Sequence, residues 1–247
     1  MQLLGVIDYD IYVWRVDLAH PAADPNELKN LLANNERSRA LEFKFLRDSK
    51  RFIIARAALR QILAMVLNAE PHSLQLSTGS YGKPGLAKEN LRFNLSHSGD
   101  LALIAVARER ELGIDVEEMR PMDDLRSIAK RFFAPQEAQR IAAMTDSATI
   151  TRAFFECWTR KEAFIKATGE GLSRPLDSFR VTFFPDCLPE LRIDSEDSAH
   201  WKLVNINAGP RYCAALVYEL LPDYPIPRIL QRQWQPPGYR EDSFATT

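Results

Sequence analysis

Apolar and polar residues alternate with a period of two in several short segments of the chain, as in a β-strand with one buried face. Alternation or a short apolar run predicts seven strands: residues 10–17, 92–95, 102–108, 112–117, 179–184, 200–206 and 212–220. Apolar residues at helical spacing predict five helices: residues 26–34, 35–67, 124–132, 135–143 and 150–168. Helices followed by strands occur twice, which indicates a mixed α/β (α+β) protein with two halves.

A break at Arg120-Pro121 separates the two halves. We expect an N-terminal half over residues 1–119, a C-terminal half over 120–221 and a tail over 222–247. The tail is rich in proline, which is excluded from helix interiors and central strands. It is predicted to wrap over the surface or to be partly disordered.

The composition narrows the classes of partner and compartment. The 247 residues include 32 basic and 33 acidic side chains, so the chain as a whole has no bias toward nucleic acid or membrane surfaces. No apolar run approaches the roughly 20 residues of a membrane-spanning helix. Cys157, Cys187 and Cys213 are scattered without CxxC spacing, which favours a reducing compartment. We therefore expect a cytoplasmic protein with no nucleic-acid or membrane partner.

The segment Gly113-Ile114-Asp115-Val116-Glu117 places two acids on one face of a predicted strand. Like-charged carboxylates on one face repel unless a cation lies between them. Oxygen ligands without a nearby His or Cys suit Mg²⁺ or Mn²⁺. The segment thus predicts half of a metal site, with an ordinary solvated strand face as the alternative.

A second segment, residues 158–166, offers a third carboxylate, Glu162, with Lys161 beside it and Lys166 one helical turn later. By itself, the Glu162–Lys166 spacing is equally that of an ordinary surface ion pair on a helix.

Three further features suit phosphate. Ser96-His97 lies where a strand meets a turn, and exposed backbone N–H groups there can cradle an anion. Gly82-Lys83-Pro84 adds a lysine in a turn, and the predicted helix 35–67 carries six arginines. A structural histidine, a surface turn and a solvated helix face are the respective alternatives. Together with a bound cation, these features suit a nucleotide pyrophosphate, although the Walker loop, GxGxxG and Gly-x-Ser-x-Gly motifs are absent.

The order of these motifs resembles the Sfp-type 4′-phosphopantetheinyl transferase family. The matching segments are Gly82-Lys83-Pro84, residues 93–98, residues 113–117, residues 158–166, residues 169–172 and residues 175–179. The resemblance extends over about residues 35–220.

The resemblance implies a fold of two similar α/β halves related by a pseudo-twofold axis, with the active site in the cleft between them. It implies transfer of the phosphopantetheine arm of coenzyme A to a serine of an apo acyl or peptidyl carrier protein, with release of 3′,5′-ADP. The chain is then expected to be a monomer that resembles a dimer internally. Which carrier protein it serves is not encoded in these motifs.

For the reaction centre, the resemblance implies that Asp115, Glu117 and Glu162 bind Mg²⁺, or Mn²⁺ in its place. Glu162 is also the candidate general base for the serine hydroxyl, with a bound water as the alternative. Lys166 is expected to stabilise charge on the leaving phosphate, and Lys161 to assist catalysis.

For coenzyme A, the resemblance implies six binding residues besides Lys166: Arg39, Arg51, Lys83, Pro84, Ser96 and His97. The chain departs from some relatives at Glu36 and Phe52, where those carry a basic or hydroxyl ligand.

A separate expectation concerns the carrier protein, whose acidic surface requires a basic or apolar partner. Lys130-Arg131-Phe132-Phe133 is our candidate docking segment. Two other classes of function remain open from the sequence: a different metal-dependent phosphotransferase or phosphatase, and a non-catalytic module that binds coenzyme A or a carrier protein.

Overall fold

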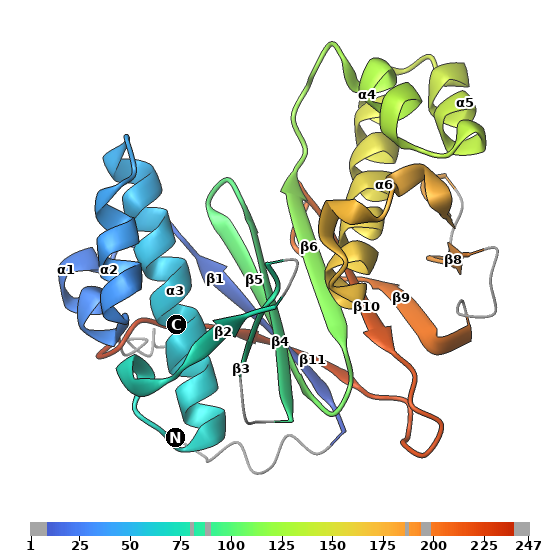
Figure 1. The fold of residues 1–247 in the computed structure, drawn as a ribbon. Coiled ribbons are helices and arrows are strands. Elements are labelled where there is room, and N and C mark those ends of the chain that lie inside the picture. Colours follow the sequence, from blue (N-terminus) through green and yellow to red (C-terminus); the bar gives the residue numbers. More distant parts are fainter. Residues whose placement is uncertain (1–8, 80–81, 87–89, 186–187, 194–198, 240–247) are drawn as a thin grey trace, which may run out of the picture.

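The computed structural model describes residues 9–79, 82–86, 90–185, 188–193 and 199–239. It has two halves, each formed by a β-sheet with helices on its outer side (Figure 1). Each half carries one helix of 22 residues packed against its sheet. The predicted fold class, mixed α/β (α+β) with two similar halves, is confirmed.

The N-terminal sheet has the strand order β11-β1-β5-β4. Its members are β1 (Ile11–Asp17), β4 (Leu91–Ser98), β5 (Leu101–Arg108) and β11 (Ile229–Gln233). Neighbours pair antiparallel, except that β11 runs parallel to β1. On β1, Tyr12, Trp14 and Val16 pack toward the helices, whereas Ile11 and Val13 belong to a separate core. Successive side chains of a strand point to opposite faces. Both faces of β1 are therefore buried, each in a different core.

Helices α1 (Pro25–Leu28), α2 (Asn34–Leu41) and α3 (Leu46–Leu67) cover this sheet, with short 3-10 turns at Lys29–Leu31 and Pro71–Ser73. The prediction of a single helix over residues 35–67 is wrong, because α2 ends before Glu42 and a second helix, α3, begins after Phe45.

The break between α2 and α3 follows from a buried charge. Glu36 on α2 is 5% exposed and forms ion pairs with Arg56 (3.1 Å) and Arg60 on α3. A buried carboxylate requires such partners, and it reaches them only when α2 folds back along α3. Glu36, a departure from some relatives in the sequence, is therefore a structural residue.

The C-terminal sheet has the order β6-β10-β9, with antiparallel pairing throughout. Its strands are β6 (Leu112–Glu118), β9 (Trp201–Asn205) and β10 (Tyr212–Glu219). Its helices are α4 (Leu125–Phe132), α5 (Pro135–Ala143) and α6 (Ser147–Thr168). Two small ribbons, β2 (Leu76–Thr78) with β3 (Pro84–Leu86) and β7 (Arg180–Val181) with β8 (Leu191–Arg192), and 3-10 turns at Gly171–Ser173 and Leu176–Ser178 complete the described structure.

Helix α6 has well-defined ends and packs very closely against β6. The Asp146 side chain accepts a hydrogen bond from the Thr149 N–H (2.7 Å) at its N-terminus, and Gly169 ends it with φ 73°, as predicted. A Cβ atom at Gly113 of β6 would lie 2.2 Å from the Ala163 carbonyl oxygen. Only glycine therefore permits this approach of helix to strand.

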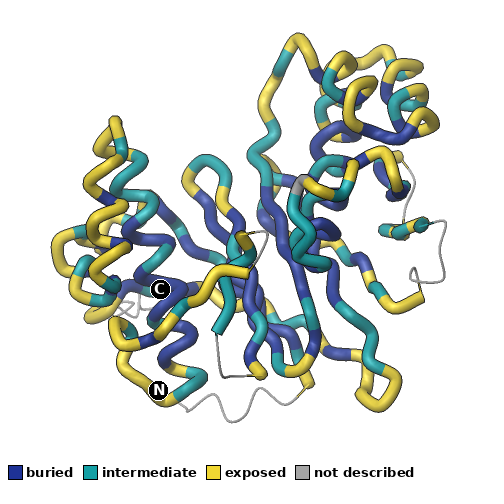
Figure 2. The backbone as a smooth tube through the Cα atoms, viewed as in Figure 1, coloured by how far each residue is buried: buried dark blue, intermediate teal, exposed yellow. Residues whose placement is uncertain are grey.

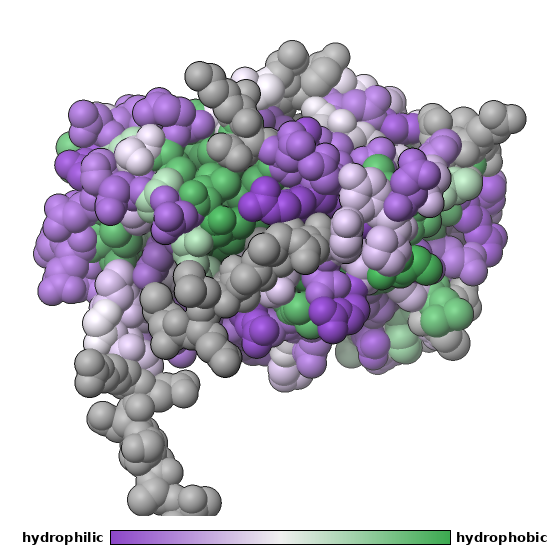
Figure 3. Space-filling model, turned by 90° about the horizontal axis from the view of Figure 1, so that it is seen from below, coloured by the Kyte–Doolittle hydropathy of each residue, from purple (hydrophilic) through white to green (hydrophobic). Residues whose placement is uncertain are grey.

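Buried residues line the strands and the inner sides of the helices (Figure 2). One core lies between the N-terminal sheet and its helices, a second between the C-terminal sheet and α6. A third core joins apolar residues of β1 and β5 to those of β6 and β10, so the two halves share one interior. Seen from the end opposite α4 and α5, the surface is mostly hydrophilic with small hydrophobic areas (Figure 3).

Where β4 and β6 meet, side chains replace a backbone ladder; we call this contact the β4–β6 seam. Three side-chain oxygens of β4 accept hydrogen bonds from three backbone N–H groups of β6: Asn94 Oδ1 from Ile114 (2.9 Å), Ser96 Oγ from Val116 (3.3 Å) and Ser98 Oγ from Glu118 (3.1 Å). Buried backbone N–H groups need acceptors, and these side chains supply them at the edge of the C-terminal sheet.

Strand pairing corrects two predicted boundaries. Strand β6 pairs with β10, so residues 112–118 belong to the C-terminal half, although the sequence break at Arg120-Pro121 assigned them to the N-terminal half. The tail expected over 222–247 contains β11, which returns to the edge of the N-terminal sheet beside β1. This edge position agrees with the prediction that the tail holds no central strand. Within the described residues, no helix is long and apolar enough to cross a membrane.

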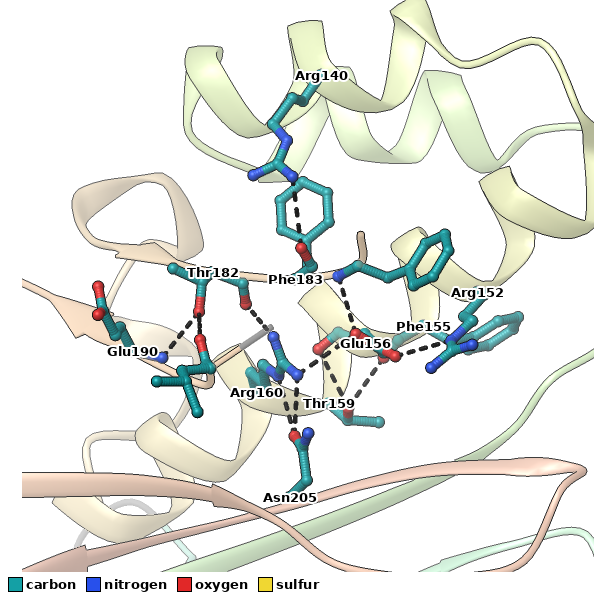
Figure 4. Close-up of polar contacts among 12 residues, drawn as sticks. Arg140, Arg152, Phe155, Glu156, Thr159, Arg160, Thr182, Phe183, Glu190 and Asn205 are labelled. Carbon is teal, nitrogen blue, oxygen red and sulfur yellow. Dashed lines mark hydrogen bonds and ion pairs between the residues drawn. The ribbon is translucent and has the colours of Figure 1, made fainter. Parts of the chain in front are cut away.

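Arg160 of α6 ties the irregular part of the C-terminal half to its long helix (Figure 4). Its guanidinium donates to the Thr182 carbonyl and to Asn205 Oδ1 (2.9 Å), and it lies 3.3 Å from Glu156 Oε2. Glu156 in turn accepts from the Phe184 N–H (2.9 Å). The arginine is 2% exposed, and these contacts satisfy its charge in the interior.

Lys161, the next residue, is also fully buried. Its ammonium lies 2.8 Å from Glu137 Oε2 and donates to the carbonyls of Leu176 (2.8 Å) and Phe179 (2.6 Å). Glu137 is buried as well and accepts from the Val181 N–H (2.7 Å). The pair joins α5, α6 and the chain that follows α6.

We predict that Lys161→Met lowers the free energy of unfolding by about 3–5 kcal/mol, because it leaves the Glu137 carboxylate buried without its counter-ion. Urea denaturation followed by circular dichroism measures this. The exposed Lys202 of β9 offers a matched control, and Lys202→Met is expected to change stability by less than about 0.5 kcal/mol. Equal effects of the two substitutions would contradict the structural role of Lys161.

Candidate functional site

Strand β6 presents its two acids toward α6. Asp115 is 3% exposed and Glu117 is half-buried, and both lie on the face opposite to Ile114 and Val116, which pack in the core between the sheets. The period of two therefore places the carboxylates as the sequence predicts.

Helix α6 brings the other half of the site. Glu162 and Lys166 lie one turn apart and share a helix face. The Lys166 ammonium is 2.6 Å from Asp115 Oδ1 and donates to Ser96 Oγ (3.0 Å). Since a Cβ at Gly113 would overlap the backbone of this part of α6, the glycine is what brings the helix within reach of Asp115.

The pKa values of two acids in the site, Glu117 and Glu162, are raised. Burial, the negative charge of Asp115 and that of Glu117 raise the pKa of Glu162, although Lys166 opposes the change. Burial also raises the pKa of Glu117, with a smaller contribution from Asp115, while the hydrogen bond from Ser98 lowers it. Carboxylates with raised pKa values that act on one another are typical of a functional site.

One carboxylate oxygen at the centre of this group has no partner. Asp115 Oδ2 is buried without a hydrogen bond in the described structure, while Asp115 Oδ1 contacts both Ser96 (2.8 Å) and Lys166. Among the described side chains, no three His, Cys, Asp or Glu residues surround a single metal position. Lys166 supplies the positive charge beside Asp115 in this arrangement.

Lys161 is not part of this group, contrary to its predicted catalytic role. Its ammonium is 0% exposed and is bound to Glu137 and two backbone carbonyls within the C-terminal half. Neighbouring residues of a helix point about 100° apart, so Lys161 is turned away from the face that carries Glu162 and Lys166.

The predicted coenzyme A residues differ in how close they lie to the acids. Desolvation and the positive charges of Lys166 and Arg51 lower the pKa of His97, although its side chain remains exposed. Arg51 binds Asp100 Oδ1 (2.6 Å) in the turn after β4. Arg39 instead pairs with Glu42 (2.5 Å) on the exposed side of α2.

Lys83 and Pro84 line a hollow of about 280 Å³ together with Glu162 and Lys166. The Lys83 ammonium bonds to Glu111 Oε2 (2.7 Å) and to the Ala167 carbonyl oxygen at the end of α6 (2.9 Å). Burial lowers the pKa of Lys83, while Glu111 opposes this change. The structure thus brings the Gly82-Lys83-Pro84 turn to the acids and attaches it to α6.

A larger hollow, of about 940 Å³, lies beside the first half of α6 and the start of β10. It is lined by Arg152, Glu156 and Arg160, whose charges are paired with one another. Because it lacks Asp115, Glu117 and Glu162, we place the functional site at the acids and not at this hollow.

The predicted docking segment is only partly at the surface. Lys130, Arg131 and Phe132 of α4 are exposed. Phe133 is 3% exposed and stacks on Phe154 of α6, with ring centroids 5.3 Å apart. Phe133 is therefore a core residue, which corrects its inclusion in the docking segment.

The sequence interpretation missed four residues that shape the site: Asn94, Ser98, Glu111 and Gly113. A signal for two of them was available. Asn94, Ser96 and Ser98 alternate along one strand as Asp115 and Glu117 do along the other, which indicates facing polar sides. Glu111 and Gly113 act through contacts that no local pattern predicts.

Two models of one protein family match the chain. Residues 111–217 match the model of the 4′-phosphopantetheinyl transferase superfamily, and residues 22–109 match that of the 4′-phosphopantetheinyl transferase N-terminal domain. The boundary between the two matches lies just before β6. Strand pairing divides the two halves at the same place, because β6 pairs with β10.

Relatives from bacteria and animals match most of the chain. The 4′-phosphopantetheinyl transferase HetI of Nostoc sp. is 39% identical over 186 residues, which cover 74% of this chain and 78% of the relative. The 4′-phosphopantetheinyl transferase Sfp of Bacillus subtilis is 29% identical, covering 79% and 85%. The L-aminoadipate-semialdehyde dehydrogenase-phosphopantetheinyl transferase of Homo sapiens is 31% identical, covering 67% and 60%. The chain thus belongs to the 4′-phosphopantetheinyl transferase superfamily and is a 4′-phosphopantetheinyl transferase.

Proposed function

We propose that the chain transfers the phosphopantetheine arm of coenzyme A to a serine of an apo acyl or peptidyl carrier protein through the site between β6 and α6, with Mg²⁺ and with release of 3′,5′-ADP. The observation that carries this proposal is the convergence of Asp115, Glu162 and Lys166 at one place, from a strand and a helix far apart in sequence.

The donor set fits a hard divalent cation. Asp115, Glu117 and Glu162 offer only carboxylate oxygens, which suit Mg²⁺ or Mn²⁺. The buried, unpartnered Asp115 Oδ2 and the raised pKa values of Glu117 and Glu162 are both relieved by a positive charge. When bound there, the ion would neutralise pyrophosphate oxygens and polarise the attacked phosphorus.

The protein residues then have distinct tasks in the transfer. The serine oxygen of the carrier forms a bond to the phosphorus next to pantetheine, and the bond from that phosphorus to the bridging oxygen breaks. The serine proton goes to the Glu162 carboxylate or to a water beside it. Lys166 is 28% exposed, so its ammonium is available to the charge that develops on the departing 3′,5′-ADP.

Coenzyme A would lie across the cations of Arg51 and Lys166, with the His97 imidazole near them as a hydrogen-bond donor to phosphate. Arg51 and Lys83 are bound to Asp100 and Glu111, so a phosphate would take over donors that these acids now use. Pro84 would offer an apolar surface to the adenine, and Arg39 an exposed cation for the 3′-phosphate. The Ser96 hydroxyl is already hydrogen-bonded to Asp115, the Val116 N–H and Lys166. It would therefore bind a phosphate only by giving up one of these hydrogen bonds.

Mass spectrometry tests the reaction directly. We expect an apo carrier protein incubated with coenzyme A, Mg²⁺ and this chain to gain the mass of phosphopantetheine, and EDTA to abolish the gain. Release of inorganic phosphate without an adduct would instead indicate a phosphatase.

In this assay, Glu162→Gln is expected to lower the transfer rate at least about 100-fold, because the amide neither accepts the serine proton nor contributes negative charge to the metal site. Its melting temperature should stay close to that of the wild type. Glu170→Gln, at a half-exposed carboxylate that pairs with Arg174 after α6, is a matched control with full activity expected. Near-normal turnover of the Glu162 variant would refute the assignment.

We predict that His97→Ala weakens coenzyme A binding about five- to tenfold and leaves kcat nearly unchanged, because an exposed imidazole beside Lys166 and Arg51 serves to bind phosphate. Isothermal titration of coenzyme A and steady-state kinetics separate the two effects. The exposed His200 provides the control substitution His200→Ala. An unaltered coenzyme A affinity in the His97 variant would rule out this role.

For the carrier protein, we propose that the exposed cations of α4 form part of the docking surface. Reversal of both charges, Lys130→Glu with Arg131→Glu, is expected to raise KM for the carrier about tenfold and to leave KM for coenzyme A unchanged. Lys202→Glu with Arg232→Glu changes the net charge equally at exposed positions on other elements. If both double variants raise KM alike, only the overall charge matters and α4 has no special part.

A further inference from the structure

The β4–β6 seam contains an arrangement that occurs twice. Ser98 Oγ accepts from the Glu118 N–H (3.1 Å) and donates to Glu117 Oε2 (2.7 Å). Ser96 Oγ accepts from the Val116 N–H (3.3 Å) and donates to Asp115 Oδ1 (2.8 Å). A hydroxyl group has one proton and two acceptor positions, so in each case the single proton is committed to a carboxylate.

Strand geometry explains why each serine reaches both groups. A residue of β4 faces an N–H of β6 twenty positions later and the side chain nineteen positions later. Along β6 the residues on this face are Gly113, Asp115 and Glu117. Asn94 therefore occupies the first place in the seam, where the facing residue of β6 is Gly113 and offers no carboxylate, and its Oδ1 accepts from the Ile114 N–H (2.9 Å).

We propose that Ser96 and Ser98 are positioning residues that orient the two β6 carboxylates toward the metal ion, and that Asn94 performs only the structural part of the same task. This inference rests on the proposed metal site. Each serine contacts one oxygen of its carboxylate, and at Asp115 the second oxygen remains buried and unpartnered. The hydrogen bonds hold two like charges on one strand face in fixed orientations before the ion arrives.

Ser98 is the better residue for the test, because Ser96 also contacts Lys166. The probe is Mn²⁺, whose binding to the full-length protein is measured by electron paramagnetic resonance. Ser98→Ala is expected to weaken Mn²⁺ binding about 10- to 100-fold, as loss of an outer partner of a metal ligand typically does. Ser98→Thr keeps the hydroxyl group and is expected to restore the affinity.

Asn94→Ala is the matched control. Like Ser98→Ala, it leaves one β6 N–H without its acceptor, so both substitutions are expected to lower the melting temperature. Only Ser98→Ala should lower the affinity for Mn²⁺. In the transfer assay it should also raise the Mg²⁺ concentration needed for half-maximal rate, while coenzyme A affinity stays unchanged.

Equal Mn²⁺ affinities of Ser98→Ala and the wild type would overturn the positioning role and leave the proposed function intact. Equal losses in Ser98→Ala and Asn94→Ala would also overturn it, because general loosening of the seam would then be the cause. A wild-type protein that transfers phosphopantetheine but binds no Mn²⁺ at the acids would overturn both the metal site and this inference. Absence of transfer by the wild type would refute the proposed function alone.

Discussion

The site depends on how the edge of the C-terminal sheet is satisfied at the β4–β6 seam. In an antiparallel pair, alternate N–H groups of a strand point away from its partner, so those of Ile114, Val116 and Glu118 point away from β10. Side chains of β4 accept them in place of backbone carbonyls. The same contact joins the two halves of the molecule and orients the acids, which places the chemistry directly at their junction.

A second constraint is the close packing of α6 on Gly113. The missing side chain permits contact between helix backbone and strand, and this contact delivers Glu162 and Lys166 to the face that carries Asp115. The result is three carboxylates and one ammonium in a partly desolvated place, where charges interact more strongly than in water. Burial, followed by the repulsion from neighbouring acids, raises the pKa values of Glu117 and Glu162.

The elements that depend on local patterns could be predicted from the sequence. The acid face of β6, the end of α6 at Gly169 and the helices α4 and α5 follow from residue periodicity and helix-end preferences, with ends shifted by a few residues. The break between α2 and α3 could not, because it depends on ion pairs of Glu36 with a distant part of α3. Strand β11 is short and proline-flanked, and only its pairing with β1 defines it.

By itself, the sequence determined which residue types could do the chemistry and which of them share a face, since side-chain direction repeats with the period of a strand or helix. Only the tertiary structure decided which partner each of these side chains binds. Lys166 pairs with Asp115 and Lys161 with the buried Glu137, although both lysines belong to one sequence motif. The tertiary structure also made Ser98 a partner of Glu117. Such partners lie tens of residues apart, and only the packing of α6 and the joining of β4 to β6 bring them within hydrogen-bond distance.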